Sequence, residues 1–121
     1  TLQLRQRNVF VNNKTFNFEM VPGDTVYMNH TDAMRFLKDH IVSIDDFDAK
    51  AAAINEEDGQ IIENSILTLK SFNMGDNEAE NVKVVVKKGL TSSFLVGEGF
   101  LTRTFGNFTV DKAKKVIIFE K

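Results

Sequence analysis

The amino-acid sequence predicts a mainly β domain that carries one clear helix. Apolar and polar residues alternate with a period of two through most of the chain, which is typical of half-buried strands. Short clusters of Asn, Asp and Gly separate these stretches, as turns between neighbouring strands do. One stretch, residues 31–40, changes to the period of a helix.

The chain opens with a predicted hairpin. Strands at 9–11 and 16–20 flank a turn at 12–14, where asparagine tolerates the positive φ angles of a tight turn. Residues 22–24, Pro-Gly-Asp, end the second strand because proline and glycine both interrupt regular pairing. Extended structure then resumes at 25–28.

The predicted helix follows at residues 31–40. Thr31 is the expected N-cap, since a Thr side-chain oxygen can accept one of the unpaired N–H groups of the first turn. Asp32 favours the same end of the helix through the helix dipole. The apolar face has the spacing i, i+3, i+4, i+7 and consists of Ala33, Phe36, Leu37 and His40.

Hairpins dominate the rest of the chain. Strands at 49–54 and 60–69 are predicted to flank an acidic turn at 55–59, which ends in the strong turn signal Asp-Gly. The remaining predicted elements are strands at 72–74, 82–86, 94–97, 108–110 and 116–119, with one or two helical turns at 98–104.

Composition excludes several classes of function. The length of 121 residues predicts one domain over residues 1–121. The absence of cysteine excludes disulfides and thiol catalysis, and a net charge of −2 argues against a nucleic-acid partner. No apolar run reaches the ~18 residues that span a membrane. Because the chain begins with Thr1, we expect a processed or trimmed piece of a longer product.

The sequence offers no metal or cofactor motif. His30 and His40 are the only histidines, and they lack the spacing of a metal site. Residues 45–48, Asp-Asp-Phe-Asp, resemble the start of a calcium loop, but Lys50 replaces an oxygen ligand and the required glycine is missing. We therefore expect no metal ion and no other cofactor.

Several segments, in order along the chain, resemble the retropepsin-like aspartic proteases. Residues 11–28 are similar to the family's approach to the active site, in which a strand ending in Phe-x-hydrophobic leads to Asp-Thr-Gly-Ala-Ser. An Asp-Ala pair then opens a short helix, as residues 32–33 do. Residues 94–101, Phe-Leu-Val-Gly-Glu-Gly-Phe-Leu, resemble the second signature of the family, and residues 108–119 its closing hairpin. The resemblance implies a retropepsin-like closed β-barrel with a flap hairpin at 55–59 and one or two short helices.

Gly97 fits this resemblance on physical grounds. A glycine has no Cβ, so another backbone segment can approach it closely. In the family, the matching glycine lies under the active-site loop. The resemblance therefore implies that the backbone of Gly97 contacts the loop that follows the strand at 16–20, and the alternative is a glycine that only ends its own strand.

The catalytic motif itself departs from the family pattern. Val21, Pro22 and Gly23 stand where the family has Asp-Thr-Gly, and Pro22 is the only proline of the chain. Asp24 and Thr25 follow at the family's Ala and Ser positions. The family's chemistry needs one carboxylate from each half of a two-fold dimer, because the two carboxylates share one proton around a bound water. Val21 cannot ionise, and Pro22 has neither the hydroxyl nor the N–H that braces the two loops.

The leading interpretation is therefore a catalytically inactive, aspartic-protease-like domain, a pseudoprotease, that binds peptides or proteins or assembles as a dimer. The resemblance implies a second copy or a sister retropepsin-like domain as partner, and an extended peptide as a further ligand. The expected peptide contacts are Asp24, Thr25, Ile54, Asn55, Glu56, Glu57, Asp58 and Gly59.

Three alternatives stay open at this stage. One is an active aspartic endopeptidase that uses Asp24, although a motif slipped to 24–26 puts the β-branched Val26 where glycine should accept unusual backbone angles. A second is the inert half of an active protease pair. A third is a structural β module of a larger secreted protein.

Overall fold

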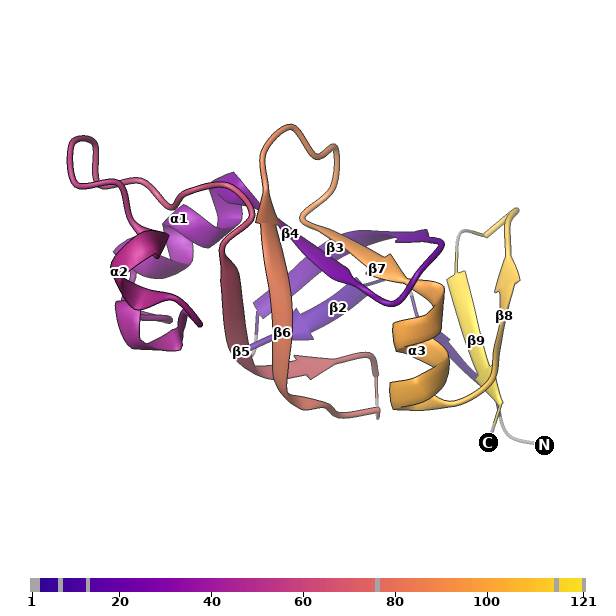
Figure 1. Ribbon diagram of the computed structural model, residues 1–121. Coiled ribbons are helices and arrows are strands. Elements are labelled where there is room, and N and C mark those ends of the chain that lie inside the picture. Colours follow the sequence, from indigo (N-terminus) through magenta and orange to yellow (C-terminus); the bar gives the residue numbers. More distant parts are fainter. Residues whose placement is uncertain (1–2, 7, 13, 76, 115, 121) are drawn as a thin grey trace.

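Within residues 3–6, 8–12, 14–75, 77–114 and 116–120, which the computed structural model describes, six strands close into a barrel and three form a separate sheet (Figure 1). The strands are β1 (Gln3–Gln6), β2 (Asn8–Val11), β3 (Lys14–Val21), β4 (Val26–Asn29), β5 (Ile66–Asn73), β6 (Glu80–Lys87), β7 (Phe94–Gly97), β8 (Phe108–Asp111) and β9 (Val116–Glu120). The helices are α1 (His30–Lys38), the short 3-10 helix η1 (Ile44–Asp46), α2 (Lys50–Ala53) and α3 (Glu98–Phe105). The spatial order is β2-β3-β7-β4-β6-β5 in the barrel and β1-β9-β8 in the end sheet.

Strand β7 lies between β3 and β4, although it comes much later in the chain. It runs parallel to β3, with Val21 opposite Gly97, and antiparallel to β4, with Val26 opposite Val96. Parallel neighbours need a long crossover connection, which the whole segment from β4 to β6 provides. The arrangement brings the loop between β3 and β4, residues 22–25, next to the start of α3.

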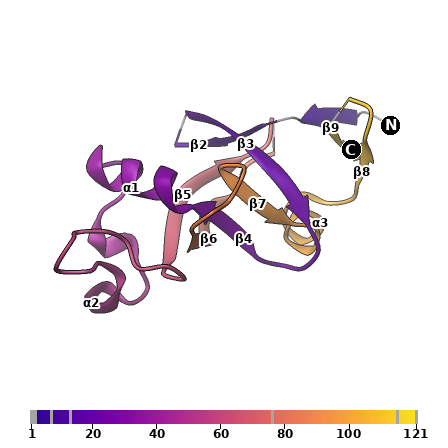
Figure 2. The same ribbon diagram turned by 90° about the horizontal axis from the view of Figure 1, so that it is seen from above.

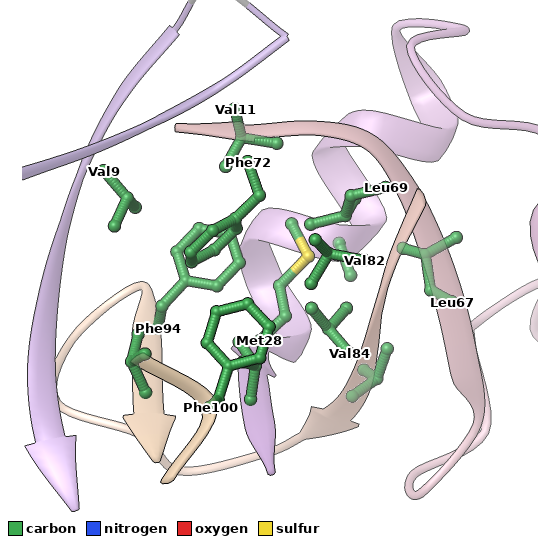
Figure 3. Packing of buried hydrophobic residues seen from close by; sticks show 14 of the residues in the cluster. Val9, Val11, Met28, Leu67, Leu69, Phe72, Val82, Val84, Phe94 and Phe100 are labelled. Atoms are coloured by element: carbon green, nitrogen blue, oxygen red, sulfur yellow. The ribbon is translucent and has the colours of Figure 1, made fainter. Parts of the chain in front are cut away.

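Buried apolar side chains fill the barrel (Figure 3). The predicted alternation is confirmed along β2, where Val9 and Val11 are buried between exposed neighbours. At the centre, the ring of Phe72 packs edge-on against Phe94 and Phe100, with ring centroids 5.5 Å and 5.8 Å apart. Each such pair contributes about 0.5–1.5 kcal/mol beyond its buried area. The apolar faces predicted from the sequence therefore form the core of the barrel.

The predicted helix at 31–40 exists as α1, with corrected ends. Asn29 and not Thr31 is the N-cap, since the Asn29 side-chain oxygen accepts the Thr31 N–H at 3.0 Å. Ala33 and Phe36 are buried as predicted. His40 lies beyond the helix at a φ of 58° and is exposed, so its predicted place on the apolar face is wrong.

The predicted strand at 49–54 is wrong, because most of this stretch forms α2. Its sequence, Lys-Ala-Ala-Ala, has high helix propensity and lacks the β-branched and aromatic residues that strands favour. The only pairing described across the 55–59 turn is an isolated bridge between Ile54 and Ile61. The next strand, β5, begins at Ile66, later than the predicted start at residue 60.

The other predicted hairpins are confirmed. Strands β2 and β3 pair across a turn in which Asn12 adopts a φ of 49°, while residue 13 lies outside the described residues. Strands β5 and β6 also pair, and so do β8 and β9, although residues 76 and 115 in their turns likewise lie outside the described residues.

The N-terminal strand β1, which the sequence pattern did not predict, pairs with β9. Together with β8, these strands form a sheet at one end of the barrel, whereas α1 and α2 lie at the other end (Figure 2). No helix among the described residues is long and apolar enough to cross a membrane.

Candidate functional site at the loop between β3 and β4

The loop between β3 and β4 carries the positions where the sequence predicted a degenerate catalytic motif. β3 ends at Val21, whose side chain is half-buried, and Pro22 and Gly23 are exposed in the bend that follows. Gly23 has a φ of 101°, a conformation that residues with a Cβ rarely adopt. The glycine at this position is therefore required by the turn itself.

The expected contact between Gly97 and this loop is confirmed. The Gly97 N–H donates to the Thr25 carbonyl at 3.0 Å. A Cβ built on Gly97 would overlap the carbonyl oxygen of Gly23 and would lie 2.9 Å from the Thr25 nitrogen. Any larger residue at position 97 must push these two backbone segments apart.

A second glycine, Gly99, supports the loop and was not identified from the sequence. Its N–H donates to the Gly23 carbonyl at 2.8 Å. A Cβ at this position would overlap Oδ1 of Asp24, because the carboxylate lies directly against the start of α3. The paired glycines at 97 and 99 are the sequence signal of this close approach.

Asp24 lies on the α3 side of the loop. Its side chain is 73% exposed, and Oδ1 accepts a hydrogen bond from Nη1 of Arg103 in α3 at 3.5 Å. An exposed ion pair of this kind contributes only ~0–1 kcal/mol to stability. The contact nevertheless gives the Asp24 carboxylate a partner within its own chain.

A cavity of about 460 Å³ opens beside the loop. Asp24 and Thr25 line it together with Phe100, Arg103 and Thr104 of α3. Residues 79–83, at the beginning of β6, also line it, and the remaining lining residues are Val26, Ile66 and Val85. This volume lies within the ~300–1,000 Å³ range of ligand pockets, so the first two predicted peptide contacts border a space that can hold a ligand.

The turn at 55–59, which carries most of the other predicted peptide contacts, lies elsewhere. Gly59 lines a different cavity of about 670 Å³, against α1, together with Met34. Figures 1 and 2 both show the segment after α2 at the opposite end of the barrel from the loop between β3 and β4. The structure therefore does not bring Ile54–Gly59 together with Asp24 and Thr25.

Helix α1 holds this turn through the backbone of Ile61. Nε2 of the buried His30 is hydrogen-bonded to the Ile61 carbonyl at 2.7 Å. On the other side, the Ile61 N–H donates to the Met34 sulfur at 3.2 Å. Within the turn, the Gly59 N–H donates to the Asn55 carbonyl at 2.8 Å, with Gly59 at a φ of 71°. The two contacts with α1 explain why the turn lies beside that helix.

The described residues suggest no metal ligands. No group of three His, Asp or Glu side chains among them gathers closely enough to hold an ion. In the acidic stretch at 45–48, Asp45 instead pairs with Lys50 at 3.0 Å and Asp48 pairs with Lys83 at 2.9 Å. These carboxylates therefore act in exposed ion pairs.

Two solved structures resemble this chain closely enough to establish its fold. A retropepsin-like aspartic protease from Rickettsia conorii is 23% identical, with a TM-score of 0.59 over 96% of this chain and 88% of that chain. The retroviral protease-like domain of Ddi1 from Leishmania major is 12% identical, with a TM-score of 0.53 over 97% of this chain and 88% of that chain. No protein-family model and no curated protein sequence matches the chain.

The chain thus has a retropepsin-like fold, mainly β with a closed barrel and short helices.

Proposed function

We propose that this chain is a retropepsin-like domain without peptidase activity, which binds extended peptide or protein segments or assembles with a partner domain. The observation that carries the proposal is the pair Val21-Pro22 at the end of β3, in the loop that Gly97 and Gly99 hold in place. The backbone of the loop is supported on α3 and β7, while Val21 and Pro22 offer no acid and no hydroxyl.

The absence of a carboxylate at position 21 is decisive for the chemistry. Aspartic-protease catalysis uses two close carboxylates, of which one accepts and the other donates a proton around a bound water. Val21 has only methyl groups, and Pro22 lacks both a hydroxyl and a backbone N–H. A valine pair in place of the acids would exclude the water that attacks the peptide bond.

Asp24 is the one carboxylate in the loop, and its surroundings favour a structural role over catalysis. It stands three residues after Val21, contacts Arg103, and occupies the space where Gly99 lacks a side chain. In the slipped motif, the buried Val26 would replace the glycine that the turn needs, whereas Gly23 holds the positive φ angle. These contacts support the register in which Val21 takes the place of the acid.

The proposed partner is a second copy of this chain or a sister retropepsin-like domain. If the sister domain carries an intact Asp-Thr-Gly motif, this chain is the inert half of an active pair. As peptide contacts we propose Asp24 and Thr25, which line the 460 Å³ cavity. The contribution of Ile54–Gly59 stays a prediction, and it requires a peptide that reaches the second cavity beside α1.

A cleavage assay tests the absence of activity. The purified chain is incubated with a proteome-derived peptide library from acidic to neutral pH, with and without pepstatin, and new peptide termini are measured by mass spectrometry. We expect no cleavage above that of a buffer blank, because no carboxylate pair is available. Cleavage that pepstatin inhibits and that Asp24→Asn abolishes would contradict the proposal and establish the active-enzyme alternative.

A further inference from the structure

Half of strand β6 has an unpaired edge. On the side that faces β5, strand β6 is paired from Glu80 to Val85. On its other side, β4 reaches only the last three residues, 85–87, because β4 begins at Val26 and the chain before it turns away as a loop. In the described pairings, residues 80–84 therefore have no strand partner on the β4 side. An exposed edge of this kind is a template for another strand.

The 460 Å³ cavity runs along this edge. Five consecutive residues, 79–83, line it. Because successive side chains of a strand point to opposite faces, a cavity over one face would be lined by every second residue. The consecutive run indicates that the cavity reaches the backbone edge of residues 80–83, while Ile66 and Val85 show that it also extends over the solvent face of the β5–β6 pair. Phe100, Arg103 and Thr104 of α3 complete the lining. We call this space the β6–α3 slot.

The slot has apolar side chains at its base among polar ones. Val26, Val82 and Phe100 line it, and they are only 1%, 6% and 8% exposed. An added strand directs alternate side chains toward the inside of the sheet, where apolar groups would contact these three residues. Strand addition uses two features that are both present here: unpaired backbone groups, which bond the added strand, and apolar side chains, which contact its alternate residues.

The charges of the slot favour a basic residue at one end. The Asp24 carboxylate is paired with Arg103, and the Lys83 ammonium is paired with Asp48 at 2.9 Å. Glu80, which is exposed at the start of β6, takes part in none of the described ion pairs. A lysine or arginine beside the strand-forming part of a ligand would complement this carboxylate.

We propose that the β6–α3 slot binds an extended peptide, which adds to residues 80–84 as a further strand. Its inward side chains are apolar, and a basic residue lies near Glu80. The proposal rests on the proposed peptide-binding function and deepens it, because it assigns the ligand to the β6 edge rather than to the turn at 55–59.

Selection of peptides tests the position of the site. The full chain is immobilised and screened with a phage-displayed library of random peptides, and synthetic copies of enriched peptides are used in hydrogen-exchange measurements. Slower exchange confined to amides of residues 79–84 supports the slot. Protection at 54–62 instead overturns the slot while leaving peptide binding intact, and the absence of any enriched peptide overturns both.

A pair of exposed substitutions on α3 tests whether the peptide enters the slot. Thr104→Trp places an indole in the lining, whereas Thr102→Trp places the same group at a position of α3 outside the lining. We expect Thr104→Trp to weaken the affinity of a slot-binding peptide at least about tenfold, which corresponds to ~1.4 kcal/mol, and Thr102→Trp to leave it unchanged. Equal affinities for the two variants would contradict the proposal.

Two modified probes test how the peptide is recognised. Backbone N-methylation at alternate positions removes the N–H donors of an added strand, so one of the two possible alternating patterns should abolish binding. Undiminished binding of both patterns would exclude strand addition. Glu80→Gln should selectively weaken peptides with a basic end, and equal effects on peptides without one would exclude the predicted charge contact.

Discussion

At the scale of single residues, the position of the loop between β3 and β4 depends on two glycines, because a side chain at either one would overlap the loop. Gly97 and Gly99 allow the backbone of residues 22–25 to lie directly on the start of α3, and both donate N–H groups to it. The Asp24 carboxylate then takes the space above Gly99. The Asp24 carboxylate thus lies where a side chain at position 99 would otherwise be, and this contact is the physical basis of its proposed structural role.

A double-mutant cycle at Gly99 and Asp24 tests this match. Gly99→Ala should force the exposed Asp24 carboxylate away from Arg103 and lower the free energy of unfolding by up to ~1 kcal/mol, since its Cβ overlaps the end of this side chain. In an Asp24→Ala background the same change should cost less, with a coupling energy of at least about 0.5 kcal/mol in urea unfolding. Additive effects of the two substitutions would mean that Asp24 and Gly99 do not share this space.

The contact between His30 and Ile61 gives a second prediction at this scale. His30→Leu leaves the buried Ile61 carbonyl without its partner, which should cost ~1–3 kcal/mol of stability. It should also speed hydrogen exchange at residues 55–61, because the turn loses one of its two ties to α1. His40→Asn is the control, since His40 is exposed at a positive φ that Asn tolerates. Unchanged exchange in the His30 variant would show that this contact does not hold the turn.

At the scale of elements, most strands could be predicted from the sequence, but the position of the turn at 55–59 beside α1 could not. Period-two alternation identified most of the barrel strands because each has one face in the core. The stretch before the turn at 55–59 was predicted as a strand, but it forms α2. Its short alanine run has no period that distinguishes a strand from a helix, and alanine favours the helix. The turn lies beside α1 because of the contacts of Ile61 with His30 and Met34. Contacts between such distant segments leave no local pattern in the sequence.

The candidate site was predictable to a similar extent. The sequence placed a loop at residues 22–24 after a strand and pointed to the close approach of Gly97, because glycine and proline act through the backbone itself. It did not reveal Gly99, Arg103 or the open edge of β6. These features arise only when β7 enters the barrel between β3 and β4, and strand order does not follow from periodicity.

Packing of β3 against β7 gives a prediction at this scale. Gly97→Ala should lower the free energy of unfolding by ~1–3 kcal/mol or more, because its Cβ overlaps backbone atoms that have no flexible end to move. Gly59→Asn is a suitable control, since nothing lies within 4 Å of a Cβ there and Asn tolerates its φ of 71°. A cost at Gly97 no larger than that at Gly59 in urea unfolding would contradict the close backbone packing.

At the scale of the whole molecule, a retropepsin-like barrel carries Val21 and Pro22 where β3 passes into the loop before β4. If the proposed partner is a second copy of this chain, the chain should self-associate in solution. Sedimentation equilibrium should give a dimer mass that depends on concentration if the partner is a second copy. A monomer at all concentrations that also enriches no peptides would favour the structural-module alternative.

The most direct test of the proposed loss of catalysis is a crystal structure of the assembled form, either the dimer of this chain or its complex with a sister domain. We expect the Val21 side chain to lie nearest the two-fold axis, with the Asp24 carboxylate still against Gly99 and Arg103 of its own chain. Two Asp24 carboxylates facing each other across the axis within hydrogen-bond distance would contradict the proposal.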